Sequence, residues 1–236
     1  MVKILIIFYM HIYMSYPRIW INNKMKIILL TNHRVGTFVI RLLCKRNKNY
    51  KKITNQKELK NNYNIDEYQI YLFTRNPYYR FLSTFLLFLY EKPTSTLLGN
   101  PQHQNLMPNI KKKYFNKKRN CNNITNFNYC LDQFDKYFDF FYENRLECND
   151  GHWLSQTHNI IYDADILSKT TFIKFEELNK EENIKIINKL FNINTLPKRH
   201  CTTYKFNKKL YLQPKLIKIV NKYYSDDLNI LNYTKL

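Results

Sequence analysis

Residues 26–44 read KIILLTNHRVGTFVIRLLC, and the fold is decided in this stretch. The opening KIILLT is a short, continuous apolar run, which is typical of a strand buried on both faces of a parallel sheet. In the closing FVIRLLC, apolar side chains recur at helical spacing, at Phe38, Val39, Leu42 and Leu43. The intervening NHRVGT, residues 32–37, is then a turn from a strand into a helix.

The same order of strand, turn and helix recurs further along the chain. Residues 70–74, IYLFT, form a second apolar run, and RNPYYRFLSTFLLFLYEK follows, with Pro77 suited to the first helical position. A third strand is expected over 170–175, and further helices over 178–191 and from Pro214 onward. Alternating strands and helices predict an α/β fold with three layers, α/β/α, around a central parallel sheet.

Both turns follow the carboxyl ends of predicted parallel strands, which is where ligands bind in such folds. The two turns are therefore expected to share one site. At turn 32–37, the unpaired N–H groups and the dipole of the following helix favour a phosphate or sulfate. Gly36 allows close approach, Thr37 offers a hydroxyl, and Arg34 adds positive charge. A single glycine after a strand is equally consistent with an ordinary tight turn, and the sequence lacks the Walker A pattern GxxxxGK[ST].

The second turn carries a stronger pattern. Arg75 follows the strand, and Ser83 lies in the second turn of the helix that Pro77 begins. A guanidinium at the strand end and a hydroxyl on the helix can hold a second phosphate from two sides. Arg80, at i+3 spacing from Ser83, is expected in a salt bridge or an aromatic stack rather than on a ligand.

The chain is strongly basic, with 38 Lys and Arg against 18 Asp and Glu among 236 residues, a formal net charge of +20. This charge favours polyanions, anionic membranes or negatively charged small molecules as partners. An AT-rich codon bias and attraction to an acidic partner both remain open as the origin of the many lysines. The few arginines are expected where a planar guanidinium can hold an oxyanion by two hydrogen bonds. Only three Gly and seven Pro, with 44% hydrophobic residues, exclude collagen-like and most low-complexity classes.

The five cysteines show neither a CxxC pair nor zinc-ligand spacing, so no metal site is expected. Cys121, Cys130 and Cys148 lie close enough in sequence for a disulfide in an oxidising compartment, and a reduced state in the cytosol is equally open.

The expected organisation is an apolar N-terminal arm of uncertain role, residues 1–25, and a single domain, 26–236. A variable insertion is expected at about 92–128, where prolines, a glycine and lysines gather. The opening VKILIIFYMHIYM is short of the roughly 20 apolar residues that span a bilayer. A signal peptide, a leading strand and a misassigned start all remain open.

Residues 75–83, RNPYYRFLS, resemble the R-[DN]-P-Y-x-R-[LF]-x-S signature of sulfotransferases, especially the Golgi carbohydrate sulfotransferases and their bacterial and viral relatives. That signature binds the 3′-phosphate of 3′-phosphoadenylyl sulfate (PAPS). Upstream, HRVGT (33–37) is similar to the family's P-K-x-G-[ST] loop, which takes the 5′-phosphosulfate. Further segments resemble family elements in the same order, namely GHWLSQ (151–156), TFIKFEEL (171–178), LPKRHCT (196–202) and KYYSDD (222–227).

The resemblance covers residues 26–234 and implies a P-loop-NTPase-like sulfotransferase fold, with PAPS as sulfate donor, 3′-phosphoadenosine 5′-phosphate (PAP) as product and no metal. The implied donor-binding residues are Arg34, Val35, Gly36, Thr37, Phe38, Arg75, Ser83 and Thr202. The implied catalytic residues are Arg34, which stabilises charge on the bridging oxygen, and His152, which takes the proton of the acceptor hydroxyl. His152 is equally consistent with a structural histidine beside Trp153, and a Glu within 58–67 or His158 is then the next candidate base.

Three positions depart from the family pattern. Arg34 stands where the loop has lysine, and it keeps the charge but is a poor proton donor because its pKa exceeds about 12. Ser155 replaces a proline and His200 an asparagine.

The expected activity is in-line transfer of a sulfuryl group from PAPS to an acceptor hydroxyl, which the family resemblance suggests is that of a carbohydrate. The alternative is a basic protein that binds nucleic acid or polysaccharide through KKKYFNKK (111–118) without catalysis. A kinase would need a loop lysine and a carboxylate placed for Mg²⁺, and neither is evident in the sequence. A sulfotransferase scaffold that binds the nucleotide but has lost turnover because of Arg34 is a further alternative. Family analogy suggests the Golgi or secretory lumen or a membrane, and the cytoplasm remains open if the arm is no signal.

Overall fold

The computed structural model describes the chain as two compact units. The sheet unit comprises residues 1–76 and 156–203, and the helical unit comprises residues 77–155 and 204–236. The residues that the structure describes are 18–32, 35–53, 56–90, 124–125, 127–132, 135, 153–157, 164–193 and 208–236. The single domain predicted over 26–236 stays a prediction, and the two units are described separately.

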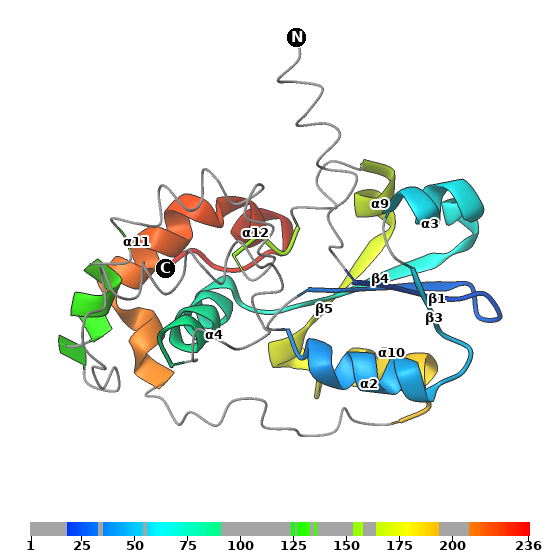
Figure 1. The fold of residues 1–236 in the computed structure, drawn as a ribbon, viewed down its shortest axis with the longest axis horizontal. Helices are drawn as coiled ribbons and strands as arrows, with labels where there is room; N and C mark the ends of the chain where they lie inside the picture. Colours follow the sequence, from blue (N-terminus) through cyan, green and yellow to red (C-terminus); the bar gives the residue numbers. More distant parts are fainter. Residues whose placement is uncertain are drawn as a thin grey trace, which may run out of the picture. The chain divides into compact units, whose positions relative to one another are not determined.

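Among the described residues, the sheet unit contains five strands in the order β3-β1-β2-β4-β5 (Figure 1). Their bounds are β1 Arg18–Asn22, β2 Ile27–Thr31, β3 Lys51–Ile53, β4 Gln69–Thr74 and β5 Thr170–Lys174. Strands β2, β4 and β5 run parallel to one another, as the sequence predicts, and every residue of β2 is buried. The apolar run of β2 is explained by this burial, because a central parallel strand is covered on both faces.

The predicted central parallel sheet is confirmed in part: β2, β4 and β5 are parallel, but β1 pairs antiparallel with both β2 and β3. Only residues 23–26 join β1 to β2, whereas a parallel crossover needs about a dozen residues or more. The turn is closed by Asn22, whose side-chain oxygen accepts a hydrogen bond from the N–H of Met25 at 3.1 Å. A strand thus lies within residues 1–25, the stretch expected as an arm, and the α/β sheet is mixed.

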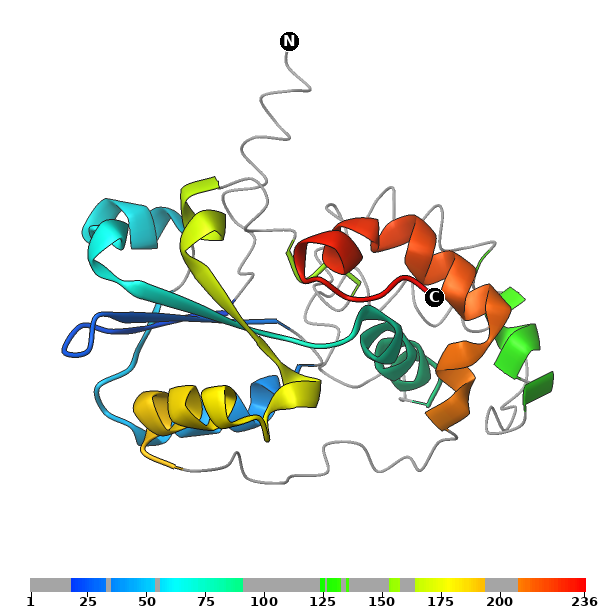
Figure 2. The same cartoon turned by 180° about the vertical axis from the view of Figure 1, so that it is seen from behind.

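Helices cover both faces of this sheet (Figure 2). One face packs against α2 (Thr37–Arg46) and α10 (Glu181–Phe191), and the other against α3 (Gln56–Asn62) and α9 (Ala164–Lys169). Alternate side chains of β4 divide between the faces, with Tyr71 and Phe73 toward α2 and α10. The helices predicted after β2 and after β5 are therefore confirmed, whereas β1, β3 and α9 were not foreseen.

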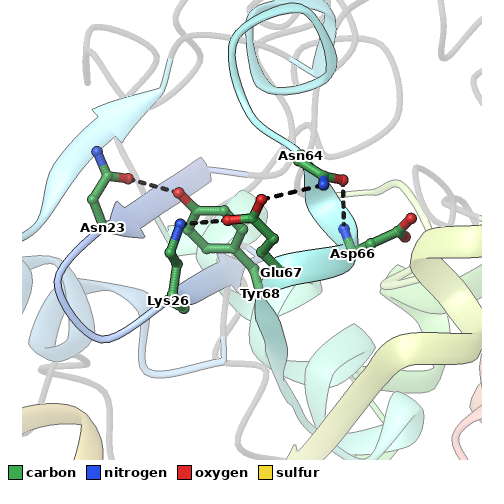
Figure 3. Close-up of polar contacts among 6 residues, drawn as sticks. All are labelled: Asn23, Lys26, Asn64, Asp66, Glu67 and Tyr68. Carbon is green, nitrogen blue, oxygen red and sulfur yellow. Dashed lines mark hydrogen bonds and ion pairs between the residues drawn. The ribbon is translucent and has the colours of Figure 1, made fainter.

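The amino end of the sheet is held by a polar cluster around the 3-10 helix η1 (Ile65–Glu67), shown in Figure 3. Lys26 Nζ lies 2.5 Å from Glu67 Oε2, and this hydrogen bond raises the pKa of Lys26 and lowers the pKa of Glu67. Tyr68 donates its hydroxyl to Asn23 Oδ1 at 3.0 Å, and Asn64 Nδ2 donates to Glu67 Oε1 at 3.3 Å. Because the side chains of Lys26 and Glu67 are half exposed, water and salt screen the ion pair, and its main effect is to align the hairpin with η1.

The helical unit is centred on α4 (Pro77–Tyr90), α11 (Pro214–Tyr223) and α12 (Ser225–Ile230), with the 3-10 helix η4 (Lys208–Leu212). The buried face of α4 follows the helical period, with Tyr78, Phe81, Leu82 and Phe85. Pro77 and Pro214 begin α4 and α11, as predicted. No helix in the described part of the chain is long and apolar enough to cross a membrane.

Two hydrogen bonds on one hydroxyl make Tyr78 a testable link in the helical unit. The Tyr78 hydroxyl donates to Asn221 Oδ1 at 2.6 Å and accepts from the N–H of Leu236 at 2.9 Å. We expect Tyr78→Phe to lower the free energy of unfolding by about 1–2 kcal/mol, as measured by urea denaturation. The control is Tyr63→Phe, which removes a hydroxyl but keeps the ring, whose centroid lies 6.2 Å from that of Tyr68. Equal stability of the two variants would contradict the prediction.

Candidate functional site

The carboxyl ends of β2, β4 and β5 lie at one edge of the sheet. Thr31 pairs with Phe73, and Thr74 pairs with Lys174, so the three strands end in register. The turn that follows β2, the turn that follows β4 and the 3-10 helix η3 (Phe175–Glu177) therefore leave the sheet side by side. In a parallel sheet this edge is where ligands bind.

The first turn is shaped by Gly36, which has a φ of 73° and directly precedes α2. Its carbonyl accepts hydrogen bonds from the N–H groups of Val39 at 2.9 Å and Ile40 at 3.2 Å. A Cβ at this position would overlap the ring of Phe175, so the position requires glycine for both its conformation and its space. The neighbour that fills this space is the ring of Phe175 in η3, so the predicted close approach of an anion to Gly36 stays a prediction.

The start of α2 has the features of an anion site. The first N–H groups of a helix have no partner within the helix, and the helix dipole is positive there. No acidic residue occupies the first turn of α2. The hydroxyl of Thr37 donates to the carbonyl of Asn32 and so closes the turn, Val35 is fully buried, and Phe38 is 41% exposed. Arg34 lies outside the described residues, so its charge stays a prediction.

The second turn is held by Gln156, which the sequence did not single out as a site residue. Gln156 Oε1 accepts the N–H of Arg75 at 2.7 Å, and Gln156 Nε2 donates to the carbonyl of Arg75 at 2.7 Å. The main-chain carbonyl of Gln156 accepts a hydrogen bond from Asn32 Nδ2 at 2.6 Å. The N–H of Asn76 is taken by Glu176 Oε1 at 2.9 Å. Three residues that the sequence-based list omitted, Gln156, Asn32 and Glu176, therefore organise this edge.

Ser83 and Arg80 belong to the helical unit, where both are buried on α4. Arg80 is only 2% exposed, and its carbonyl accepts the hydroxyl of Thr84 at 3.0 Å. A charge this deeply buried is normally paired within the protein, which favours the structural role expected for Arg80. The shared phosphate contact of Arg75 and Ser83 stays a prediction.

Other predicted residues lie beyond the described part of the chain. His152, the candidate base, is one of them, as are His158, Thr202 and residues 92–123 of the expected insertion. Trp153, beside His152 in sequence, is buried; its ring packs on Phe81 with centroids 5.9 Å apart. The carboxylates available within 58–67 are Glu58, Asp66 and Glu67, and the latter two belong to the cluster at the amino end of the sheet.

Cysteine and metal chemistry receives no support from the described side chains. Burial raises the pKa of the Cys44 thiol, which keeps it protonated and unreactive. Cys130 is buried in the helical unit, and Cys121 and Cys148 lie outside the described residues. Among the residues that the structure describes, no three His, Cys, Asp or Glu side chains gather as metal ligands would.

Comparison with protein families decides the assignment, because the model of the sulfotransferase family matches residues 22–234. The chain belongs to the sulfotransferase family. The resemblance read from the sequence over 26–234 is thereby confirmed. Searches of curated proteins and of solved structures found no match to this sulfotransferase.

Gly36 offers a direct test of the first turn in this sulfotransferase. Gly36→Ala is expected to lower the free energy of unfolding by about 1–3 kcal/mol, because alanine resists a φ of 73° and its methyl group would overlap Phe175. Urea denaturation measures the loss. The double variant Gly36→Ala with Phe175→Leu removes the overlap but not the strain, so it should recover only part of the stability. An unchanged Gly36→Ala protein would show that the turn does not need glycine.

Proposed function

We propose that this protein is a PAPS-dependent sulfotransferase that transfers a sulfuryl group to an acceptor hydroxyl. The observation that carries the proposal is the position of Arg75, the first residue of the RNPYYRFLS signature, directly after β4 and at the same sheet edge as the Gly36 turn after β2. Family membership supports sulfotransfer in general. The choice of donor rests on the signature and on the anion-binding character of the start of α2.

The donor nucleotide carries two anionic ends, and the chain offers two separate holders. The 5′-phosphosulfate is assigned to Arg34 and to four residues at the start of α2, namely Val35, Gly36, Thr37 and Phe38. Arg75 and Ser83 are assigned to the 3′-phosphate, and Thr202 to the 3′-phosphate or adenine. The lack of acidic residues in the first turn of α2 fits an anion at this helix start.

PAPS, when bound, supplies a sulfuryl group attached to a phosphate leaving group. The acceptor oxygen forms a bond to sulfur as the bond from sulfur to the bridging oxygen breaks, and PAP leaves. Arg34 stabilises the negative charge that develops on that bridging oxygen. His152 takes the proton of the acceptor hydroxyl, since an ordinary histidine pKa near 6.5 suits a base at neutral pH.

A carbohydrate is the acceptor class that the family resemblance favours. The +20 net charge adds an attraction to acidic acceptors such as anionic glycans. The same charge supports the alternative, a basic protein that binds nucleic acid or polysaccharide without catalysis. A lumenal or membrane-associated setting follows the family analogy, and a cytoplasmic one is the alternative.

Binding of PAP is the first test of the proposal. PAP should raise the melting temperature of the wild-type protein, because a ligand that binds only the native state stabilises it. Arg75→Ala should weaken PAP binding about 10- to 100-fold, the loss expected for charge-assisted hydrogen bonds to a phosphate. Arg46→Ala, which removes an exposed arginine at the other end of α2, is the matched control and should bind normally.

The alternative makes the opposite prediction. A protein that gains no stability from PAP, but binds DNA with an affinity that falls steeply as salt rises, is the basic binding protein and not a sulfotransferase.

Turnover tests the role of Arg34. Transfer of labelled sulfate from PAPS to a panel of glycans should rise at least about tenfold in Arg34→Lys, because lysine can donate a proton to the leaving oxygen and arginine cannot. Arg34→Ala should lose transfer. Equal rates for the arginine and lysine proteins would show that proton donation does not limit the reaction. A wild type that binds PAP but transfers nothing to any glycan would point to a scaffold without turnover.

A further inference from the structure

Gln156 is buried at the carboxyl edge of the sheet and contacts both turns. Only 3% of its surface is exposed, and it lies 81 residues from Arg75 and 124 residues from Asn32 in the sequence. Its side-chain amide forms a closed pair of hydrogen bonds with the backbone of Arg75, each 2.7 Å long. Its own carbonyl accepts the side-chain amide of Asn32 at 2.6 Å.

These bonds extend the sheet by one residue beyond its last pair. The pairing of β4 with β5 ends at Thr74 and Lys174, so Arg75 lies one residue beyond the ladder. The amide of Gln156 presents a donor and an acceptor in a single plane, and it satisfies both the N–H and the carbonyl of Arg75 as a neighbouring strand would. Leaving these partly buried backbone groups without hydrogen bonds would cost stability. The backbone from which the Arg75 side chain extends is therefore fixed in place.

The contacts continue into the first turn. Asn32 donates to Gln156 through its side chain, and its own carbonyl accepts the hydroxyl of Thr37, the first residue of α2. A continuous chain of hydrogen bonds thus runs from the backbone of Arg75 through Gln156 and Asn32 to Thr37. All four residues belong to the sheet unit.

We propose that Gln156 is a positioning residue that sets the separation of the two anion-binding turns, and so selects a ligand with two phosphates over ligands with one. The inference rests on the proposed function, because it assigns the turns to the two ends of one nucleotide. When two holders are rigidly spaced, the second contact is effectively intramolecular, and the gain disappears once the spacing varies. Gln156 acts through Arg75 and Thr37 and has no chemical step of its own.

The first experiment compares three nucleotides: PAP, 5′-AMP and 3′-AMP. Gln156→Met keeps the length of the side chain but removes both amide bonds to Arg75. We expect its affinity for PAP, measured by calorimetry, to fall at least about tenfold more than its affinity for either monophosphate. Gln156→Glu, which keeps an acceptor for the Arg75 N–H but loses the donor to its carbonyl, should fall between wild type and Gln156→Met. An equal loss for all three nucleotides, or none, would overturn the inference.

Two control variants separate positioning from general destabilisation. Gln69→Met changes a glutamine at the opposite end of β4, where its side chain accepts the hydroxyl of Tyr71 at 2.9 Å. Asn22→Ala removes a buried amide from the hairpin at the far end of β2. Both should keep the wild-type ratio of affinities for PAP and the monophosphates, even where stability falls. A shift of that ratio in Asn22→Ala as large as in Gln156→Met would also overturn the inference.

Hydrogen exchange tests the positioning without any ligand. In Gln156→Met the amides of Arg75 and of residues 35–37 should exchange at least about tenfold faster than in Asn22→Ala. Unchanged exchange at these amides would refute the role of Gln156 directly. A wild type that fails to bind PAP, while Gln156→Met shows the faster exchange, would instead refute the proposed function and leave the coupling of the turns standing.

Discussion

The parallel pairing of β2 with β4 is the constraint on which the rest of the sheet unit depends. Because the two strands run in the same direction and end in register, the segments that follow them leave the sheet at one edge. Those segments hold Gly36 and Arg75, which lie 39 positions apart in the sequence. Burial on both faces explains why β2 tolerates no polar side chain before Thr31.

Much of this arrangement could be predicted because it depends on local chemistry. The apolar runs of β2 and β4, the prolines that begin α4 and α11, and the glycine before α2 all act within a few residues. β1 was missed because RIWIN is only five residues long and polar at both ends, and its pairing depends on a short hairpin. The antiparallel direction of β1 follows from the short connection to β2, and the length of that connection can be read only once both strands are known.

The site shows the same division between local and distant interactions. Gly36 and Thr37 were identified from a turn that bears its own signature, and the structure assigns each a definite local role. Gln156 and Glu176 lie in segments that resemble family elements, but neither was given a role, because their partners are 81 and 100 residues away in the sequence. Polar residues whose task is to satisfy a distant backbone carry no periodicity and no spacing that marks them in advance.

The short strand β3 has a consequence for how the molecule meets its neighbours. It is the outer strand on the antiparallel side, it is three residues long, and its Lys51 and Lys52 are exposed. An open strand edge invites pairing with strands of other chains, and a brief, positively charged edge discourages it. In a chain so rich in isoleucine and tyrosine, these two lysines are expected to help keep separate copies from joining into extended sheets.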